Sequence, residues 1–318
     1  MDRNNDGLFH RPVLYHEIIN ALQPKEKGLY VDCTLGAGGH AWGILDLSSP
    51  TGKLLGLDVD PQSLIIAKER LAAFGSRAII VQASYITLIQ QLSNMGWSKV
   101  DGIVLDLGVS SMQFDTTERG FSFRYDAPLD MRFDPNSLVT AADIVNSLPE
   151  KELADLLFQY GEEKRSRKIA KMIIASRPIL TTGQLANIVT RAFEKVKRSP
   201  SRNSIHPATK TFQALRIAVN HELDALETVL PQAVSALVPG GRLAVIAFHS
   251  LEDRIVKHFF RRESRDCICP PKQPQCTCDH YAQIIEITRH PLMPTPEEKK
   301  SNPRSRSARL RIVQKLTP

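Results

Sequence analysis

The stretch Val31-Asp32-Cys33-Thr34-Leu35-Gly36-Ala37-Gly38-Gly39-His40 joins an apolar run, a glycine-rich turn and the start of a helix. The apolar run at residues 28–32 predicts a buried strand that leads into the turn. A second apolar run, residues 53–57, ends at Asp58, twenty-two positions after Gly36. This layout is typical of a nucleoside site, where glycines let the backbone approach the ligand and the acid binds ribose hydroxyls.

The glycine turn alone does not identify the nucleoside. The spacing Gly36-x-Gly38-x-x-Ala41 satisfies the dinucleotide fingerprint, which permits alanine at its last position. Strand, turn, helix and second strand with a terminal acid serve both NAD and S-adenosylmethionine. The choice between these two ligands therefore depends on the rest of the chain.

Composition places the chain among globular proteins. Its 318 residues are 42% hydrophobic and 24% charged, enough for one large domain with an insertion or for two domains. No apolar run approaches the roughly 20 residues that span a bilayer, and the polar N-terminus lacks the apolar core of a signal peptide. We therefore expect a cytoplasmic protein without a membrane segment.

Charge is distributed unevenly along the chain, whose overall net charge is +7. Residues 1–160 carry a net charge of −7, residues 161–216 carry +10, and residues 251–318 carry +6. An acidic nucleoside-binding region joined to two basic segments suggests a polyanionic second substrate, most simply nucleic acid. The alternative is a pair of solvated basic helices and a basic tail.

Periodicity predicts an α/β fold with a parallel sheet. Apolar runs that read as strands alternate with helical patterns, which is typical of βαβ units. Two later runs have no full helix between them, so we expect them to pair antiparallel at one edge. The predicted strands are residues 28–32, 53–58, 78–83, 100–106, 240–248, 284–288 and 308–313, and the predicted helices around them are residues 8–23, 41–47, 86–92, 251–260 and one beginning at Pro61.

The α/β rhythm breaks after Gly108. Residues 109–136 show no clear period, and a loop of this length inside a compact domain is usually functional or disordered. Its aromatic residues argue against disorder. Helical patterns without any strand follow, so we predict an all-helical insertion over residues 114–210, after which helices at 207–218 and 222–230 return to the α/β rhythm. The helices predicted within the insertion are residues 141–148, 149–159, 162–176 and 182–196.

Polar residues follow the ends of several predicted strands. Ligands of a doubly wound sheet lie outside the carboxyl ends of its strands. Asp32, Asp58, Asp106 and the pair His249-Ser250 are therefore expected at one edge. A small sheet that finishes with an antiparallel pair is the pattern of class I methyltransferases.

Several ordered motifs resemble, along nearly the whole chain, the bacterial family that methylates N4 of a cytidine in 16S ribosomal RNA (the RsmH or MraW family). Many separate motifs in the right order are far more specific than one glycine turn. The matching segments are His10-x-Pro-Val-Leu14, Asp32-x-Thr-Leu-Gly-Ala-Gly-Gly-His40, Asp58-x-Asp-Pro-Gln62, Leu105-Asp-Leu-Gly-Val-Ser-Ser111, Glu118-Arg-Gly-Phe-Ser-Phe123, Pro128-Leu-Asp-Met-Arg132, His206-Pro-Ala-Thr-x-Thr-Phe-Gln-Ala-x-Arg216 and Phe248-His-Ser-Leu-Glu-Asp-Arg254.

The resemblance implies a class I, Rossmann-like methyltransferase domain formed by residues 1–113 and 211–318, with residues 114–210 as an RNA-recognition insertion. It implies S-adenosyl-L-methionine as methyl donor and a decoding-centre cytidine of 16S rRNA, free or within the small ribosomal subunit, as acceptor. The cofactor contacts that it implies are Gly38, Gly39, His40, Asp58, Tyr85, Asp106 and Gln113.

Asp106 is the first candidate for a catalytic residue. The lone pair of the cytosine N4 is delocalised into the ring, and a carboxylate that accepts an N–H bond favours a pyramidal nitrogen, mainly in the transition state. Many amino-group methyltransferases have an Asn- or Asp-Pro-Pro-aromatic motif here, whereas this chain has Asp-Leu-Gly-Val. The aromatic that stacks on the base is therefore expected elsewhere, among Phe121, Phe123 and Tyr125.

Other residues keep two interpretations each. His249 is a second catalytic candidate, as a base or a cytosine ligand, or else a structural residue at a strand end. His40 acts through its side chain or through its backbone N–H alone. Asp130 and Arg132 form an internal ion pair or contact RNA. Arg216 and Asn220, one helical turn apart, face the site or cap the insertion.

Four of the five cysteines lie between residues 267 and 278. Cys267-x-Cys269 and Cys276-x-Cys278 hold enough thiols for tetrahedral zinc, but structural zinc sites usually have C-x₂-C spacing. The spacing favours free or oxidisable thiols, and we predict no metal among the functional residues. Cys33, beside the glycine turn, is expected to be a small core residue.

Rival functions remain at this point. A DNA or protein methyltransferase has the same fold, and an RNA-binding protein with a vestigial cofactor pocket has the same motifs without catalysis. Asp106 is hard to explain in a protein that only binds. The sequence leaves the oligomeric state, monomer or homodimer, open.

Overall fold

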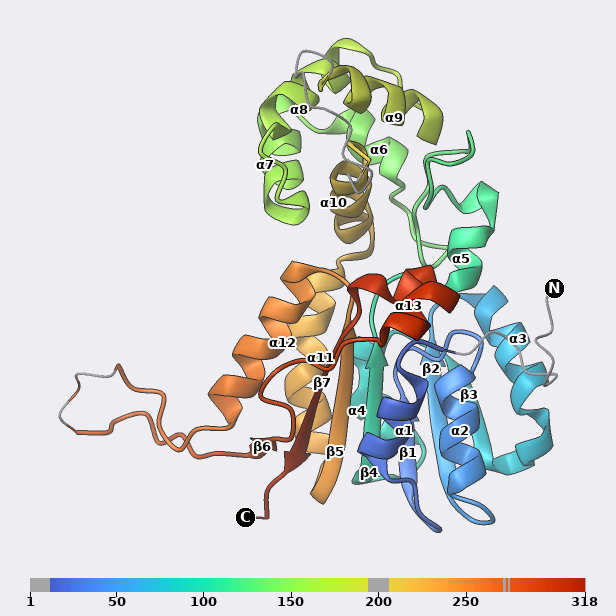
Figure 1. The fold of residues 1–318 in the computed structure, drawn as a ribbon, viewed down its shortest axis with the longest axis vertical. Helices are drawn as coiled ribbons and strands as arrows, with labels where there is room; N and C mark the ends of the chain where they lie inside the picture. The colour runs from blue at the N-terminus through green and yellow to red at the C-terminus, as the bar shows by residue number, and fades with distance from the viewer. Residues whose placement is uncertain (1–11, 194–205, 271–272, 274, 318) are drawn as a thin grey trace. The chain divides into compact units, whose positions relative to one another are not determined.

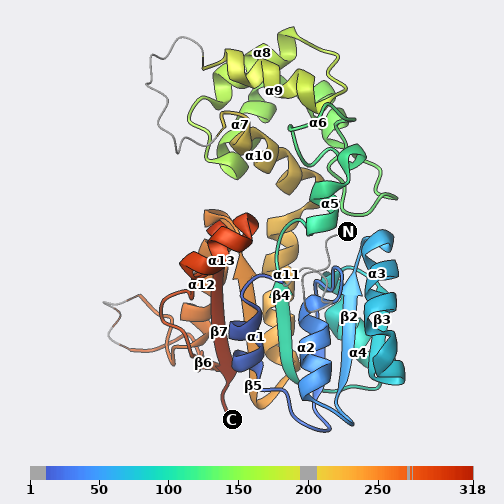
Figure 2. The same cartoon turned by 45° about the vertical axis from the view of Figure 1, so that its right-hand side comes forward.

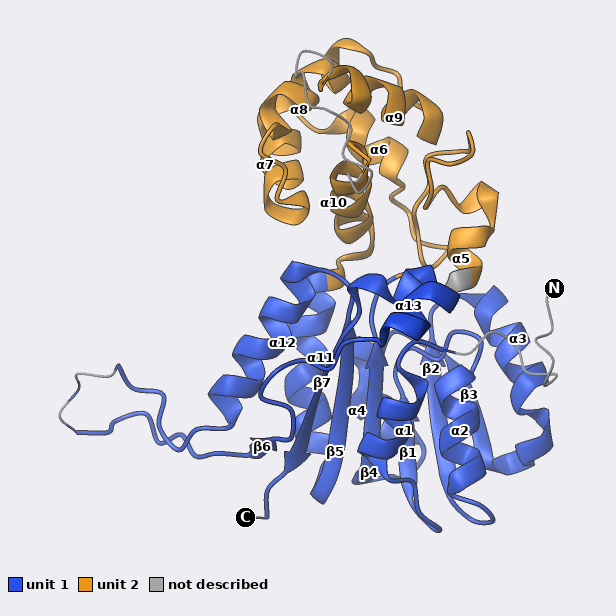
Figure 3. Cartoon of the chain, viewed as in Figure 1, with its two compact units in different colours: residues 1–108, 223–318 blue, residues 109–222 orange. Residues whose placement is uncertain are grey.

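The computed structural model describes residues 12–193, 206–270, 273 and 275–317. The chain divides into two compact units, residues 1–108 with 223–318 and residues 109–222 (Figure 3). The helical unit, residues 109–222, therefore begins before the expected insertion, residues 114–210, and ends after it. Helix α10 (Thr209–Asn220) was assigned to the α/β domain, and this was wrong because Phe212 and Leu215 pack into the core of the helical unit.

A seven-stranded sheet forms the centre of the first unit, in the order β3-β2-β1-β4-β5-β7-β6 (Figure 1). The first five strands are parallel, and β7 runs antiparallel to both β5 and β6. This is the class I methyltransferase sheet, with the antiparallel edge pair that the sequence predicted. The strands are β1 (Leu29–Asp32), β2 (Lys53–Asp58), β3 (Ala78–Gln82), β4 (Val100–Asp106), β5 (Leu237–Ala247), β6 (Ile284–Glu286) and β7 (Arg309–Lys315).

Apolar side chains on both faces explain why the central strands are nearly continuous hydrophobic runs. Val31 and Ile103 belong to one buried cluster, whereas their neighbours Tyr30 and Val104 belong to the cluster on the opposite face. Helices cover both faces (Figure 2). One face holds α1 (Tyr15–Leu22), α2 (Gly39–Leu47) and α3 (Pro61–Leu71), and the other holds α4 (Leu88–Asn94), α11 (Glu222–Ala236) and α12 (Ser250–Glu263).

A buried ion pair joins α12 to strand β7. Arg311, on β7, donates to Asp253 Oδ1 at 2.7 Å, and Arg309 donates to Asp253 Oδ2 at 3.1 Å. Burial alone raises the pKa of Asp253, but the hydrogen bonds and charges of the two arginines outweigh it and hold the pKa below its usual value. The pairing fixes α12 against the antiparallel edge.

The helical unit has a core of its own. Helix α7 packs against α8 and α10, and α8 packs against α9. Ile169 and Ile173 of α8 are buried, whereas Arg167, Lys168 and Lys171 are exposed. The helices of this unit are α5 (Ser111–Asp115), α6 (Ala141–Ser147), α7 (Glu150–Gly161), α8 (Ser166–Ala175), α9 (Thr182–Arg191) and α10.

Most differences from the predicted elements lie at helix ends. Helix α8 starts at Ser166 rather than Glu162 because Glu162 adopts a left-handed conformation that closes α7. Helix α5 lies in the segment that showed no period, where Ser110 and Gln113 form a capping box. Part of the helix predicted at 182–196, and residues 8–11 of the first predicted helix, fall outside the described residues. Within the described part of the chain, no helix combines the length and apolarity needed to cross a bilayer.

Candidate active site

The carboxyl ends of the parallel strands bring the predicted acids to one edge of the sheet. Asp32, Asp58 and Asp106 are the last residues of β1, β2 and β4. Asp106 lies opposite Ile246 of β5, so that strand ends at the same edge, two residues before His249. The expected convergence at this edge is confirmed.

The glycine turn is bonded to the strands on both sides of β1. The Gly36 N–H donates to Asp58 Oδ2 at 2.8 Å, and the Asp106 N–H donates to Thr34 Oγ1 at 2.6 Å. These contacts join residues far apart in the sequence and fix the turn between the ends of β2 and β4. Thr34 was not singled out from the sequence, and only its place inside the glycine stretch could have drawn attention to it.

Gly38 and Gly39 allow helix α2 to start close to the turn. Gly38 is the N-cap, in a left-handed conformation with φ of 76°, and no side chain caps the helix. A Cβ on Gly39 would lie 2.9 Å from Pro12 Cγ. The first N–H groups of a helix have no intrahelical partner, so this terminus offers backbone donors beside the ends of the strands.

Two backbone N–H groups already donate hydrogen bonds to the Asp58 carboxylate. Besides the Gly36 bond, its Oδ1 accepts from the Asp60 N–H at 2.9 Å. Each carboxylate oxygen keeps a second lone pair, so the group can accept further bonds from a diol. Burial raises the pKa of Asp58, although the backbone donors act in the opposite direction.

His40 and Asp106 form a pair with unused hydrogen-bonding atoms. His40 Nε2 lies 3.6 Å from Asp106 Oδ2. Among the described residues, both His40 ring nitrogens and Asp106 Oδ1 are buried and have no hydrogen-bond partner. Buried polar atoms are normally satisfied, so these atoms point to a ligand. The His40 ring stacks on Tyr15 at 6.3 Å, a contact that no motif in the sequence indicated.

Asp32 is the most deeply buried of the three acids that end β1, β2 and β4, with 1% of its surface exposed. Burial raises its pKa to about 6, against the opposing effects of His40 and of the Thr34 N–H that bonds it at 3.2 Å. Neighbouring Cys33 is buried in the core, as expected. Burial raises the pKa of its thiol as well.

His249 caps helix α12. Its Nδ1 accepts from the Glu252 N–H at 3.4 Å, while the Glu252 carboxylate accepts from the Phe248 and His249 N–H groups. His249 Nε2 lies 3.2 Å from Glu252 Oε1. That contact lacks hydrogen-bond geometry, so Nε2 is buried without a hydrogen-bond partner in the described structure. The ring thus has a structural role at Nδ1 and an unused atom at Nε2.

Tyr85 and Gln113 are the two remaining predicted cofactor residues. Tyr85 begins the 3₁₀ helix Tyr85–Thr87 after β3 and packs, half-buried, on the core of the sheet unit. Gln113 is buried in α5 of the helical unit, where its side chain accepts from the Ser110 N–H at 3.1 Å. Their cofactor roles stay predictions.

The aromatic residues of the helical unit differ in exposure. Phe121 is buried and stacks on Phe133, and Phe123 stacks on His206 at 4.5 Å. Tyr125 is 65% exposed. Of the three candidates for base stacking, Tyr125 is the most exposed, whereas Phe123 is partly buried.

Two polar pairs of the helical unit have internal partners. Arg132 donates to both oxygens of Asp130, at 2.8 and 2.7 Å. Arg216 donates to Glu222 at 2.8 Å, and Asn220 bonds the backbone of Phe133 and Met131. The ion pair that holds the long segment is confirmed, and Arg216 and Asn220 fasten the end of α10.

Comparison with known proteins identifies the family of this chain. Relatives named "Ribosomal RNA small subunit methyltransferase H" include one from Heliobacterium modesticaldum, 47% identical over 96% of this chain and 98% of its own length. Others come from Geobacter sp. strain M21, 48% identical over 98% of this chain and 100% of that one, and from Dehalococcoides mccartyi strain BAV1, 50% identical over 96% and 86%. The model of the MraW methylase family matches residues 7–316, and the chain therefore belongs to that family.

Proposed function

We propose that this chain is an S-adenosylmethionine-dependent enzyme that methylates N4 of a cytidine in 16S ribosomal RNA. Family membership supports the reaction class, and the names of the relatives support the small-subunit RNA as substrate. The observation that carries the chemistry is the unsatisfied Asp106 Oδ1, buried beside His40 at the carboxyl edge of the sheet. Since small-subunit RNA is assembled in the cytoplasm of bacteria, that compartment is part of the proposal.

The residues at this edge fit S-adenosylmethionine. The free lone pairs of Asp58 suit a ribose diol, and the turn at Gly38 and Gly39 leaves backbone donors beside it. The unused nitrogens of His40 supply polar partners that the protein itself does not satisfy. We include Tyr85 and Gln113 among the proposed contacts. When bound, the cofactor supplies an electrophilic methyl group on a sulfonium.

Asp106 orients and activates the acceptor. Its Oδ1 would accept one N4–H bond of the cytosine, and this bond would localise the nitrogen lone pair for in-line transfer of the methyl group that bound S-adenosylmethionine would supply. The proton lost from N4 goes to Asp106 Oδ1. Because this hydrogen bond strengthens as N4 becomes positive, it lowers the barrier rather than only improving binding.

His249 contributes through Nε2. With Nδ1 accepting from the helix N-terminus, a neutral ring carries its proton on Nε2. That N–H is then a donor for the cytosine carbonyl, next to the Asp106 strand. We assign His249 a binding and orienting role in catalysis, beside its structural role as a helix cap.

The helical unit is proposed to recognise RNA. Its α8 exposes Arg167, Lys168 and Lys171 on the side opposite its buried apolar residues. Basic residues of this kind position a phosphate backbone without reading its sequence. Tyr125 is the proposed stacking partner of an extruded base, because RNA bases are recognised when splayed out of the helix.

Methyl transfer to defined substrates tests the proposal. The protein is incubated with S-adenosylmethionine carrying a labelled methyl group and with small ribosomal subunits, naked 16S rRNA, duplex DNA or ribosomal proteins. We expect the label on RNA, and nuclease digestion with mass spectrometry should place it on N4 of one cytidine. Label on DNA or protein alone, or on a cytosine carbon, contradicts the proposal. Unmethylated subunits from a strain that lacks the corresponding activity supply an open acceptor position.

A further inference from the structure

The segment between α12 and β6 carries the four clustered cysteines. It extends away from the sheet (Figure 1). Its base is closed by the Gln283 N–H, which donates to Glu263 O at 2.8 Å, and by a 3.0 Å contact between His280 Nε2 and Arg262 O. The two ends of the segment are thus held together, and the described residues between them are all exposed or only partly buried.

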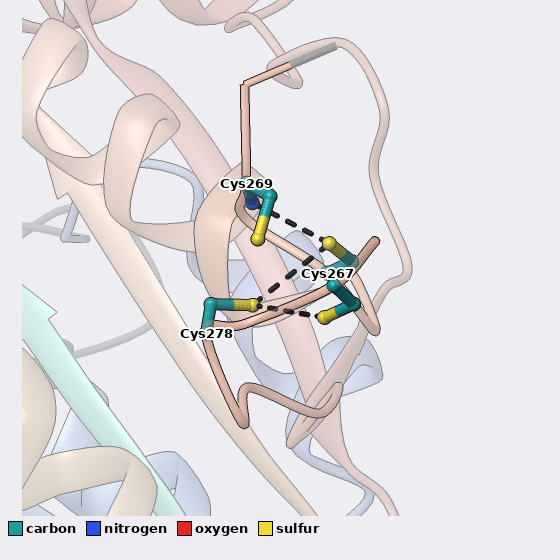
Figure 4. A group of neighbouring side chains, drawn as sticks. Cys267, Cys269 and Cys278 are labelled. Atoms are coloured by element: carbon teal, nitrogen blue, oxygen red, sulfur yellow. Dashed lines mark hydrogen bonds between the residues drawn. The ribbon is translucent and has the colours of Figure 1, made fainter. Parts of the chain in front are cut away.

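The sulfur atoms of the four cysteines lie close together, and Figure 4 labels three of these residues. All of them, from Cys267, Cys269, Cys276 and Cys278, lie within 4.8 Å of one another. Cys278 Sγ is 3.6 Å from Cys276 Sγ and 3.8 Å from Cys267 Sγ. A disulfide needs sulfurs about 2.05 Å apart, and all four thiols are free. The arrangement is a four-thiol cluster rather than a pair of cross-links.

These separations match one tetrahedral ion. Zinc binds thiolate sulfur at about 2.3 Å, and a regular tetrahedron of that radius has sulfurs about 3.8 Å apart. An iron–sulfur cluster distributes its four thiolates over two or four iron atoms, so some of its cysteine sulfurs stand farther apart than a single ion requires. The C-x-C spacing argued against zinc, but each arm of the segment supplies two sulfurs and the closed base brings the arms together.

Backbone N–H groups also point at the sulfurs. The Ile268 N–H donates to Cys278 Sγ and the Cys269 N–H to Cys267 Sγ, both at 3.4 Å, and the Thr277 N–H donates to Cys269 Sγ at 3.5 Å. Hydrogen bonds to an ionised acceptor are stronger than those between neutral groups. These donors therefore offset the excess negative charge of four thiolates around a divalent cation.

We propose that Cys267, Cys269, Cys276 and Cys278 bind one zinc ion as a structural site. Because the protein supplies all four ligands, no position is left for water or substrate, which distinguishes structural from catalytic zinc. The ion links the two arms of the segment and supplies the ordering free energy that its small apolar content cannot. The site lies apart from Asp106 and the glycine turn in the sequence and does not depend on the proposed reaction.

Metal content of the full-length protein tests the site. The untagged chain is purified under reducing conditions without immobilised nickel, and elemental analysis should find about one zinc per chain. Cys276→Ser/Cys278→Ser should reduce that value to near zero. Cys33→Ser is the matched control, because Cys33 is buried in the sheet core, and it should keep its zinc. Stoichiometric metal in the double variant, or no metal in the unaltered chain, overturns the proposal.

A second measurement uses the unaltered chain, in case the variant does not fold. Zinc is removed with a chelator and replaced by cobalt, whose visible spectrum reports the number of thiolates and the geometry. We expect the bands of a tetrahedral four-thiolate site, together with slower proteolysis between residues 264 and 283 after metal is restored. An octahedral spectrum, or proteolysis at equal rates with and without metal, contradicts the site. If the protein instead contains iron with the absorption of an iron–sulfur cluster, zinc is not the metal bound at this site.

Discussion

Single atoms at the carboxyl edge of the sheet decide whether this protein can transfer a methyl group, and Asp106 Oδ1 is the first of them. Asp106→Asn replaces the carboxylate with a neutral amide of the same shape, so the acceptor amine loses its charged hydrogen-bond partner. We expect kcat to fall about 10²- to 10⁴-fold, the usual contribution of a positioned acid or base. Single-turnover transfer of a labelled methyl group to small-subunit RNA measures this.

The control for Asp106 is Asp46→Asn, which removes an exposed carboxylate near the end of α2. It should transfer methyl groups at the unaltered rate. Thermal unfolding of both variants checks that the fold is intact. An Asp106→Asn protein that is folded and fully active would remove Asp106 from the mechanism.

Asp32 predicts a pH dependence of stability. Its pKa of about 6 in the folded state exceeds the ordinary value of 3.8, so the folded state binds the proton more tightly than the unfolded chain does. The free energy of unfolding therefore falls as the pH rises from about 4 to about 6, and the loss is complete above that window.

Asp32→Asn removes this titration while keeping an acceptor for the Thr34 N–H. We expect the variant to gain stability relative to the unaltered protein across the same window, by up to ~3 kcal/mol for a shift of about two units. Urea unfolding at a series of pH values measures the difference. Parallel curves for the two proteins would show that the buried carboxyl does not titrate there.

The sequence could predict residues whose roles follow from their spacing along the chain. It could not predict residues whose roles depend on contacts with residues far away in the sequence. Asp58 and Asp106 end apolar runs, and the rule for strand ends places them at one edge. Thr34 receives a hydrogen bond from a residue seventy-two positions away, and Tyr15 stacks on His40 from outside every nucleoside-binding motif. Neither interaction leaves a periodic signal in the sequence.

At the scale of elements, His249 joins a strand to a helix. His249→Ala removes the cap of α12 and should cost about 1 kcal/mol of stability. His249→Asn keeps a capping side chain, so we expect stability close to that of the unaltered protein. If Nε2 also orients the cytosine, His249→Asn should still lose activity. Chemical unfolding and methyl-transfer kinetics of the two variants separate the roles, and a fully active His249→Asn protein would leave only the cap.

The sequence located the strands of the sheet more accurately than the helices of the insertion. Strands buried on both faces are marked by short apolar runs, and β4 matches its predicted range, residues 100–106. Helix ends depend on local backbone conformation, such as the left-handed Glu162 that separates α7 from α8. No pattern of hydrophobic residues records that conformation, so the second helix was predicted to start at Glu162 rather than at Ser166.

At the scale of the whole molecule, the chain forms two units with separate cores. The insertion was recognisable because an all-helical stretch interrupts an α/β rhythm. Its far boundary was misplaced because α10 is amphipathic, and periodicity does not say which core an amphipathic helix faces. Phe212 and Leu215 face the helical core, and that is known only from packing.

Charge on the helical unit predicts how RNA binding responds to salt. Arg167 and Lys171 are exposed on α8, and each phosphate that a basic side chain neutralises releases condensed counterions. For Arg167→Gln/Lys171→Gln we expect weaker binding and a plot of log K against log salt whose slope is shallower by about 1 for each phosphate that is no longer neutralised. The matched control, Lys53→Gln/Lys68→Gln, removes the same charge from exposed positions of the sheet unit. Filter binding of 16S rRNA at several salt concentrations measures the slope for both variants. Equal slopes would mean that RNA binding depends on the overall net charge rather than on the basic residues of α8.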